Sequence, residues 1–158
     1  MRGRLVASAV VAALVLGATA GCTFITPQVT MDHYDPSDGI GANIDGLEVR
    51  NALLLTADGT TASLLINVVN PNKYGTNVHL QYLNSTGAKV DNTFYINGNA
   101  VKSFGGTDQA QILLTDVDAK AGTLFNVFVQ PEGETGKQLA LPVLDGSSSE
   151  YASLVPKG

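Results

Sequence analysis

The segment GLEVRNALLLTADGTTASLLINVVNPN, residues 46–72, is the longest apolar, strand-forming run after the N-terminal leader. Within it, residues 47–56 and 61–69 are rich in Leu, Val and Ile, which favours two β-strands. The Asp-Gly pair at residues 58–59 tolerates the positive φ of a tight reversal, so the strands should form a hairpin. Pro71 ends the second strand, because proline has no N–H to donate to a sheet. We expect this hairpin to be the centre of a β-sandwich.

Strand patterns continue along the chain at an interval of about ten residues, which is typical of sandwiches. Only 15% of the residues are charged and 6% are aromatic, a balance that suits short strands and many turns better than helices. The sequence therefore predicts an all-β fold, an antiparallel β-sandwich of the Ig-like or cupredoxin-like kind. The further strands expected are residues 78–83, 89–96, 100–104, 109–114, 122–130 and 138–144.

The same patterns predict one connecting element and the core. Residues 115–121 have aspartates near their start and a lysine near their end, the charge order of a short helix, so one helical turn is expected there. Alternation along the strands gives core candidates, whose inward face depends on the register of each strand. These candidates are Leu53, Leu55, Leu64, Ile66, Val68, Leu80, Tyr82, Phe125 and Val127.

The first 21 residues have the pattern of an export signal. Two arginines precede an apolar run, and small residues stand directly before Cys22. The apolar run is shorter than the roughly 20 residues of a membrane-spanning helix, which favours cleavage of the leader. Cys22 is the only cysteine in the chain, so it has no partner for an internal disulfide.

Thr19-Ala20-Gly21-Cys22 resembles the bacterial lipobox, in which small residues precede a cysteine that is lipidated before cleavage. Thr19 departs from the usual pattern, where leucine is commonest. The resemblance implies that Cys22 becomes the mature N-terminus and carries a diacylglyceryl group. Two acyl chains, at about 0.8 kcal/mol per buried CH₂, would make the anchor stable. The alternative is an ordinary secretory signal followed by a free thiol.

Composition then divides the chain into a signal peptide, a lipidated cysteine with a flexible tether, a sandwich domain and a polar tail. The expected bounds are residues 1–21, 22–45, 46–145 and 146–158. Within the tether, YDPSDG at residues 34–39 has the chemistry of a turn. Asp32, Asp35 and Asp38 do not have the spacing of an EF-hand loop, so a turn is preferred over a calcium site.

Charge and motifs narrow the classes of function. Without the leader, seven Lys and Arg remain against fourteen Asp and Glu, a net charge of −7, which argues against nucleic acid and against electrostatic docking on anionic lipid. The sequence has no Gly-x-Ser-x-Gly elbow, HExxH pair, P-loop or dinucleotide glycine pattern. We therefore expect a protein that is not an enzyme and has no cofactor.

The leader, the YDPSDG element, the strand at residues 49–52 and the hairpin that follows are together similar to small actinobacterial envelope lipoproteins of unassigned role. The segments at residues 135–139 and 142–144 also fit this resemblance. Those proteins are in turn distantly similar to periplasmic copper chaperones of the PCu(A)C type, which have a cupredoxin-like sandwich. This second resemblance implies copper bound by two Met and two His ligands.

The chain matches that ligand set only in part. Met1 leaves with the leader, so Met31, His33 and His79 are the weak metal candidates. The soft-ligand count is too small for a Cu(I) site, and the preferred expectation is no metal. A copper or small-ligand chaperone with a degenerate site remains the alternative function.

The leading expectation is a lipoprotein anchored through Cys22 at the extracytoplasmic face of the cell membrane. Its domain would act as a non-catalytic binding or scaffold module for an envelope protein or a cell-wall polymer.

Overall fold

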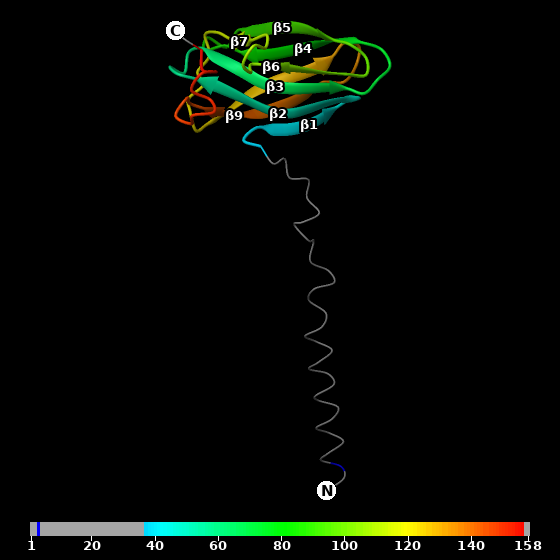
Figure 1. Ribbon diagram of the computed structural model, residues 1–158, viewed down its shortest axis with the longest axis horizontal. Helices are drawn as coiled ribbons and strands as arrows, with labels where there is room; N and C mark the ends of the chain where they lie inside the picture. The colour runs from blue at the N-terminus through cyan, green and yellow to red at the C-terminus, as the bar shows by residue number, and fades with distance from the viewer. Residues whose placement is uncertain (1–2, 4–36, 157–158) are drawn as a thin grey trace. The chain divides into compact units, whose positions relative to one another are not determined.

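The computed structural model describes Gly3 and residues 37–156. Residues 37–156 contain nine strands and no helix (Figure 1), so the expected all-β class is confirmed. The strands are β1 (Ile40–Ile44), β2 (Leu47–Thr56), β3 (Ala62–Asn70), β4 (Thr76–Leu83), β5 (Lys89–Ile96), β6 (Ala100–Phe104), β7 (Ile112–Leu114), β8 (Leu124–Pro131) and β9 (Lys137–Leu144). β7 is shorter than expected, because the Gln109 N–H closes a turn on the Gly106 carbonyl at 3.2 Å.

The strands form two layers that are joined into one curled sheet. The β2–β3 layer contains β1, β2, β3, β6 and β7, and the β4–β8 layer has the order β5-β4-β8-β9. β2 and β9 connect the layers by a short parallel pairing, in which Leu54 lies opposite Val143 and Leu55 opposite Leu144. All other pairs are antiparallel, so the expected antiparallel arrangement fails only at this seam.

A bulge at Asn51 divides β2 into two parts. The pairing of β2 with β3 shifts between Arg50 and Leu53, and Asn51 has a positive φ of 49°. Asparagine adopts this left-handed conformation more readily than most residues. The Asn51 Oδ1 atom accepts a hydrogen bond of 3.1 Å from the Gly39 N–H. A Cβ atom at Gly39 would lie 2.5 Å from the Asn51 carbonyl carbon, so only glycine fits against the bulge.

The bulge changes which side chains face the core. Before it, Leu47 and Val49 point inward, and after it Ala52 and Leu54 do, because one extra residue reverses the alternation. Leu53 and Leu55 are buried as expected but lie on the outer face of the β2–β3 layer, outside the central core. The other expected core residues are buried between the layers, and Phe125 is half-buried against them. The confirmed residues are Leu64, Ile66, Val68, Leu80, Tyr82 and Val127.

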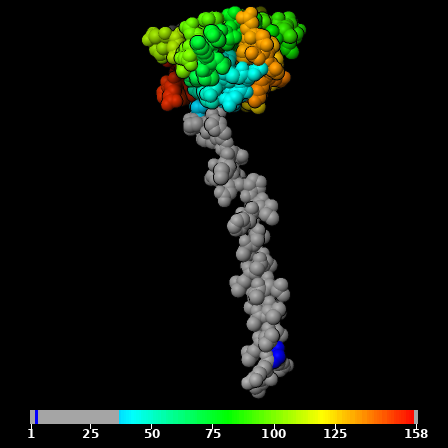
Figure 2. Space-filling view, turned by 90° about the vertical axis from the view of Figure 1, so that its right-hand side faces the viewer, coloured from blue at the N-terminus to red at the C-terminus, as the bar shows by residue number. Residues whose placement is uncertain are grey.

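β1 is a strand where part of the tether was expected. It pairs with β2 through Ile40–Ala52 and Ile44–Leu47, and a two-residue turn at Asp45-Gly46 joins the strands. Both turn residues have positive φ, 37° and 84°, as a tight hairpin requires. The β1–β2 turn lies beside the β8–β9 turn (cyan and orange in Figure 2), where the Thr135 N–H donates to Asp45 Oδ2 at 3.0 Å. The sandwich therefore begins before residue 46.

The connection at residues 115–121 is not helical, contrary to expectation. Asp116 has a φ of 54°, which a right-handed helix does not allow. The N–H groups of Val117 and Ala119 donate to the Thr60 and Gly59 carbonyls, at 3.0 and 2.9 Å. Both side chains are buried in the core. Two core residues spaced by two positions require an extended chain, so tertiary burial overrides the local charge order.

Asn70 holds the loops together at one end of the sandwich. Its side chain is fully buried, and its Nδ2 donates to the carbonyls of Tyr74 and Asn97 at 2.9 and 3.2 Å. Its Oδ1 accepts the Asn72 N–H at 3.0 Å. The Asn-Pro-Asn segment thus ends β3, as expected, and also fastens the β3–β4 loop to the β5–β6 turn.

The C-terminal segment folds back beside β2 and forms no strand. It leaves the sheet next to Leu55, and Figure 1 shows it (red) beside the end of β2. The Tyr151 hydroxyl donates to Asp38 Oδ2 at 2.7 Å, which connects this segment to the chain just before β1. Its half-buried residues Leu154 and Val155 are apolar. We infer that this segment covers the outward-facing leucines of β2.

Replacing Ile66 by alanine should destabilise the domain by about 2–5 kcal/mol, because the side chain is 1% exposed and its loss leaves a cavity between the layers. Thermal unfolding measures this effect. Val101→Ala is the control, since Val101 is 64% exposed and its truncation should change stability by no more than about 0.5 kcal/mol. An unchanged midpoint for Ile66→Ala would show that β3 is not central to the core.

The free energy of unfolding should also decrease between pH 10 and pH 12, because the Tyr151 phenol ionises. The hydrogen bond to Asp38, helped by burial and by the charges of Asp38 and Glu150, raises the pKa of Tyr151 from 10.0 to about 12. A raised pKa means that the folded state favours the neutral phenol, so this contribution is complete below pH 10 and is lost as the pH rises through 12. Urea unfolding across this range measures the decrease. Tyr151→Phe should show a smaller decrease, and an equal decrease would contradict the assignment.

Candidate functional site

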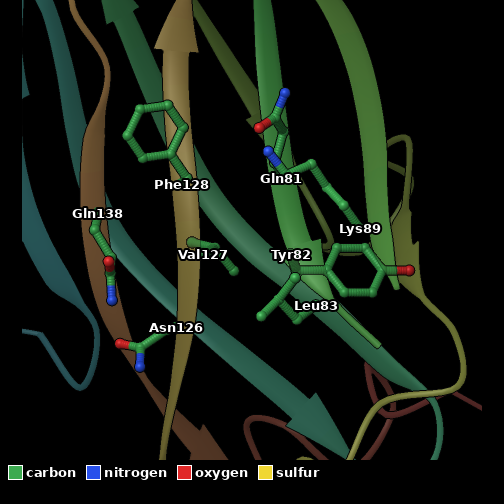
Figure 3. A pocket seen from close by; sticks show the side chains of 8 residues that line it. All are labelled: Gln81, Tyr82, Leu83, Lys89, Asn126, Val127, Phe128 and Gln138. Carbon is green, nitrogen blue, oxygen red and sulfur yellow. The ribbon is translucent and has the colours of Figure 1, made fainter. Parts of the chain in front are cut away.

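The outer face of the β4–β8 layer carries a groove of about 360 Å³. It crosses β4, β8 and β9, with one residue from the start of β5 at its side. Phe128, Gln138 and Asn126 stand on one side of it, and Gln81, Lys89 and Leu83 on the other (Figure 3). The complete lining is Gln81, Tyr82, Leu83, Lys89, Asn126, Val127, Phe128 and Gln138.

Strand alternation separates this groove from the core beneath it. On β4, Leu80 and Tyr82 are buried, so Gln81 between them points outward. On β8, Val127 and Val129 are buried, which places Phe128 outward in the same way. The same strands therefore supply both the core and the groove.

Register brings three of the side chains into one row. Gln81 on β4 lies opposite Phe128 on β8, and Phe128 lies opposite Gln138 on β9. Neighbouring strands are about 4.8 Å apart, so a glutamine stands on the neighbouring strand to each side of Phe128. The Gln138 carboxamide points toward Asn126 (Figure 3). Gly136 lies directly against the Phe128 ring and leaves no room there for a Cβ atom. The ring is therefore held in place at the β9 side of the groove.

The polar side chains of the groove differ in whether they already make hydrogen bonds within the protein. Gln81 Nε2 donates to Asp91 Oδ2 at 2.9 Å, and the Lys89 side chain runs toward Gln81 (Figure 3). Asn126 and Gln138 are exposed, and their side chains make no hydrogen bond to the part of the chain that the structure describes. Their amide groups are therefore available to a ligand.

His79, one of the candidate metal ligands, faces outward beside this groove as expected. Its Nδ1 lies 3.2 Å from Thr93 Oγ1 and 3.5 Å from Asp91 Oδ1. Among the described residues, no group of three or more His, Cys, Asp or Glu side chains is placed to hold a metal ion. Cys22, Met31 and His33 lie outside the described residues, as do Asp32 and Asp35, two of the three aspartates considered for a calcium site.

Asp38, the third of these aspartates, lies within the described residues and makes a hydrogen bond to another segment. Its carboxylate accepts the Tyr151 hydroxyl, so it contributes to the contact between the C-terminal segment and the chain before β1.

No motif in the sequence directly predicts the groove. Alternation in residues 122–130 does place Asn126 and Phe128 on one face, and an outward phenylalanine beside an asparagine is the available clue. The neighbours of Phe128 come from β4 and β9, and only the register of the folded sheet brings them together.

No family model matches this chain, and no curated protein matches it. Among the residues that the structure describes, none form a helix with the length and apolar character needed to cross a membrane.

The mature protein, from which the leader has been removed, should bind Cu(I) only weakly and without a fixed stoichiometry. A single thioether and two imidazoles lack the second soft donor that favours Cu(I), and His79 already contacts Thr93 and Asp91. Titration against a competing Cu(I) chelator measures this affinity, with the double variant Met31→Leu, His33→Gln as the comparison. One tightly bound equivalent that disappears in the double variant would instead favour the chaperone alternative.

Proposed function

We propose that this protein is a lipoprotein anchored at the extracytoplasmic face of the cell membrane, where its sandwich acts as a non-catalytic binding module of the envelope. The observation that carries the binding role is the groove of the β4–β8 layer. Its lining contains three carboxamides, a phenyl ring and one ammonium group, and no carboxylate, imidazole, thiol or aliphatic hydroxyl. Such a lining is suited to holding a ligand.

The chemistry of the lining supports binding without catalysis. Its two titratable residues are Lys89 and Tyr82. The Tyr82 hydroxyl is turned away from the groove, where it accepts the Thr115 N–H at 3.1 Å and approaches the Thr115 carbonyl at 3.4 Å. General acid–base chemistry needs a positioned proton donor and acceptor near the substrate, and one lysine alone does not supply such a pair.

The anchor rests on the sequence pattern that ends in Cys22. The segment between Cys22 and residue 37 contains two prolines and no charged run of lysine or arginine, a composition that suits a spacer. The domain is acidic, so it has no electrostatic attraction to anionic lipid and remains available to a partner in the envelope. A partner there is an envelope protein or a cell-wall polymer.

Cys22→Ala should release the protein from the membrane, because the substitution removes the acyl chains. Fractionation of cells into membrane and soluble parts measures the release, and Thr23→Ala is the control that leaves the cysteine in place. A Cys22→Ala variant that stays in the membrane fraction as fully as the control would contradict the lipoprotein proposal.

A further inference from the structure

We propose that the groove of the β4–β8 layer binds a neutral, hydroxyl-rich glycan chain. Phe128 stacks against the C–H face of a sugar ring, and the carboxamides of Gln81 and Gln138 on either side hydrogen-bond to its polar edge. This inference rests on the proposed function, since it names the chemical class of the ligand for the same module.

Carboxamides match the hydrogen-bonding groups of a sugar. Each one offers two N–H donors and an oxygen with two lone pairs, while each hydroxyl both donates and accepts. Gln81 and Gln138 lie one strand to either side of Phe128, so they are about 10 Å apart. A sugar unit stacked on the ring would lie between these two glutamines. Asn126, two residues before Phe128 on β8, adds a third carboxamide to the groove.

Phe128 gives the groove a flat apolar surface. The face of an aromatic ring carries negative electron density, which attracts polarised C–H groups such as those on one face of a pyranose. The ring is held against Gly136, so little side-chain freedom is lost when a ligand stacks on it. Leu83, which is 58% exposed, continues the apolar surface on the opposite side of the groove.

Charge in the groove favours a neutral ligand. The chain has a formal net charge of −5, yet Lys89 is the only charged residue of the lining. A polyanion would meet one ammonium group on an acidic protein. A polycation would find no carboxylate in the lining, and Asp91 beside it already accepts a hydrogen bond from Gln81 Nε2. The hydroxyl and acetamido groups of a neutral sugar need no charged partner, and the carboxamides of the groove can hydrogen-bond to both kinds of group.

The position of the groove disfavours an extended peptide. A peptide that adds to a sheet needs the free backbone groups of an edge strand. The groove lies on the face of β4 and β8, and each of these strands is paired on both sides. A ligand there meets side chains only.

The test is calorimetric titration of the full-length protein, purified in detergent, with the β-1,4-linked tetrasaccharides of N-acetylglucosamine and of glucose. We expect saturable binding of at least one of them, and a loss of affinity of at least tenfold in Phe128→Ala. Phe128→Tyr should keep the affinity, because the ring face is retained. Gln138→Ala should weaken binding several-fold, and Val101→Ala, exposed on the other layer, should leave it unchanged.

Polygalacturonate and an alanine-glycine hexapeptide are the competing probes, and circular dichroism verifies that each variant is folded. Failure of both tetrasaccharides to bind overturns the glycan inference. The inference is also overturned if polygalacturonate or the hexapeptide binds more tightly than the tetrasaccharides and Phe128→Ala abolishes that binding. Binding unaffected in both Phe128→Ala and Gln138→Ala overturns the assignment to this groove. Fractionation of Cys22→Ala tests the anchored-module proposal separately, so the two can fail independently.

Discussion

β2 is hydrogen-bonded to three strands, and the rest of the sandwich depends on which part of β2 pairs with each of them. Its first half pairs with β1, its last residues pair with β9, and β3 lies along its other edge. The bulge at Asn51 separates the two halves and reverses the side-chain alternation between them. β9 can therefore join the same edge of β2 that β1 has left, which closes the two layers around one core.

This seam also determines where the groove lies. β9 continues from its contact with β2 into an antiparallel pair with β8, and β8 pairs with β4. Alternation along these strands sends Leu80 and Val127 inward and Gln81 and Phe128 outward. Stability thus comes from one face of the β4–β8 layer, while the other face is free to carry polar and aromatic groups for binding.

The fold was largely predictable because local signals agreed with the tertiary structure. The Asp-Gly turn at residues 58–59 and the apolar runs around it predicted the β2–β3 hairpin, and the observed bounds of β2 are those expected. β1 was missed because its Asp45-Gly46 turn follows a segment rich in glycine and proline. The bulge at Asn51 and the extended course of Val117 and Ala119 are tertiary effects without a clear local signal. The groove was not predictable, since its central row joins Gln81, Phe128 and Gln138 through register alone.

Chemical-shift mapping by NMR is the most direct measurement of the central claim, which is that the outer face of the β4–β8 layer is the binding surface. The uniformly ¹⁵N-labelled full-length protein in detergent would be titrated with the N-acetylglucosamine tetrasaccharide. The account predicts shifts concentrated at Gln81, Phe128 and Gln138 and their strand neighbours, with β3 and β6 unaffected. Shifts confined to the β2–β3 layer or to the loops, or no shifts with either neutral tetrasaccharide, would contradict it.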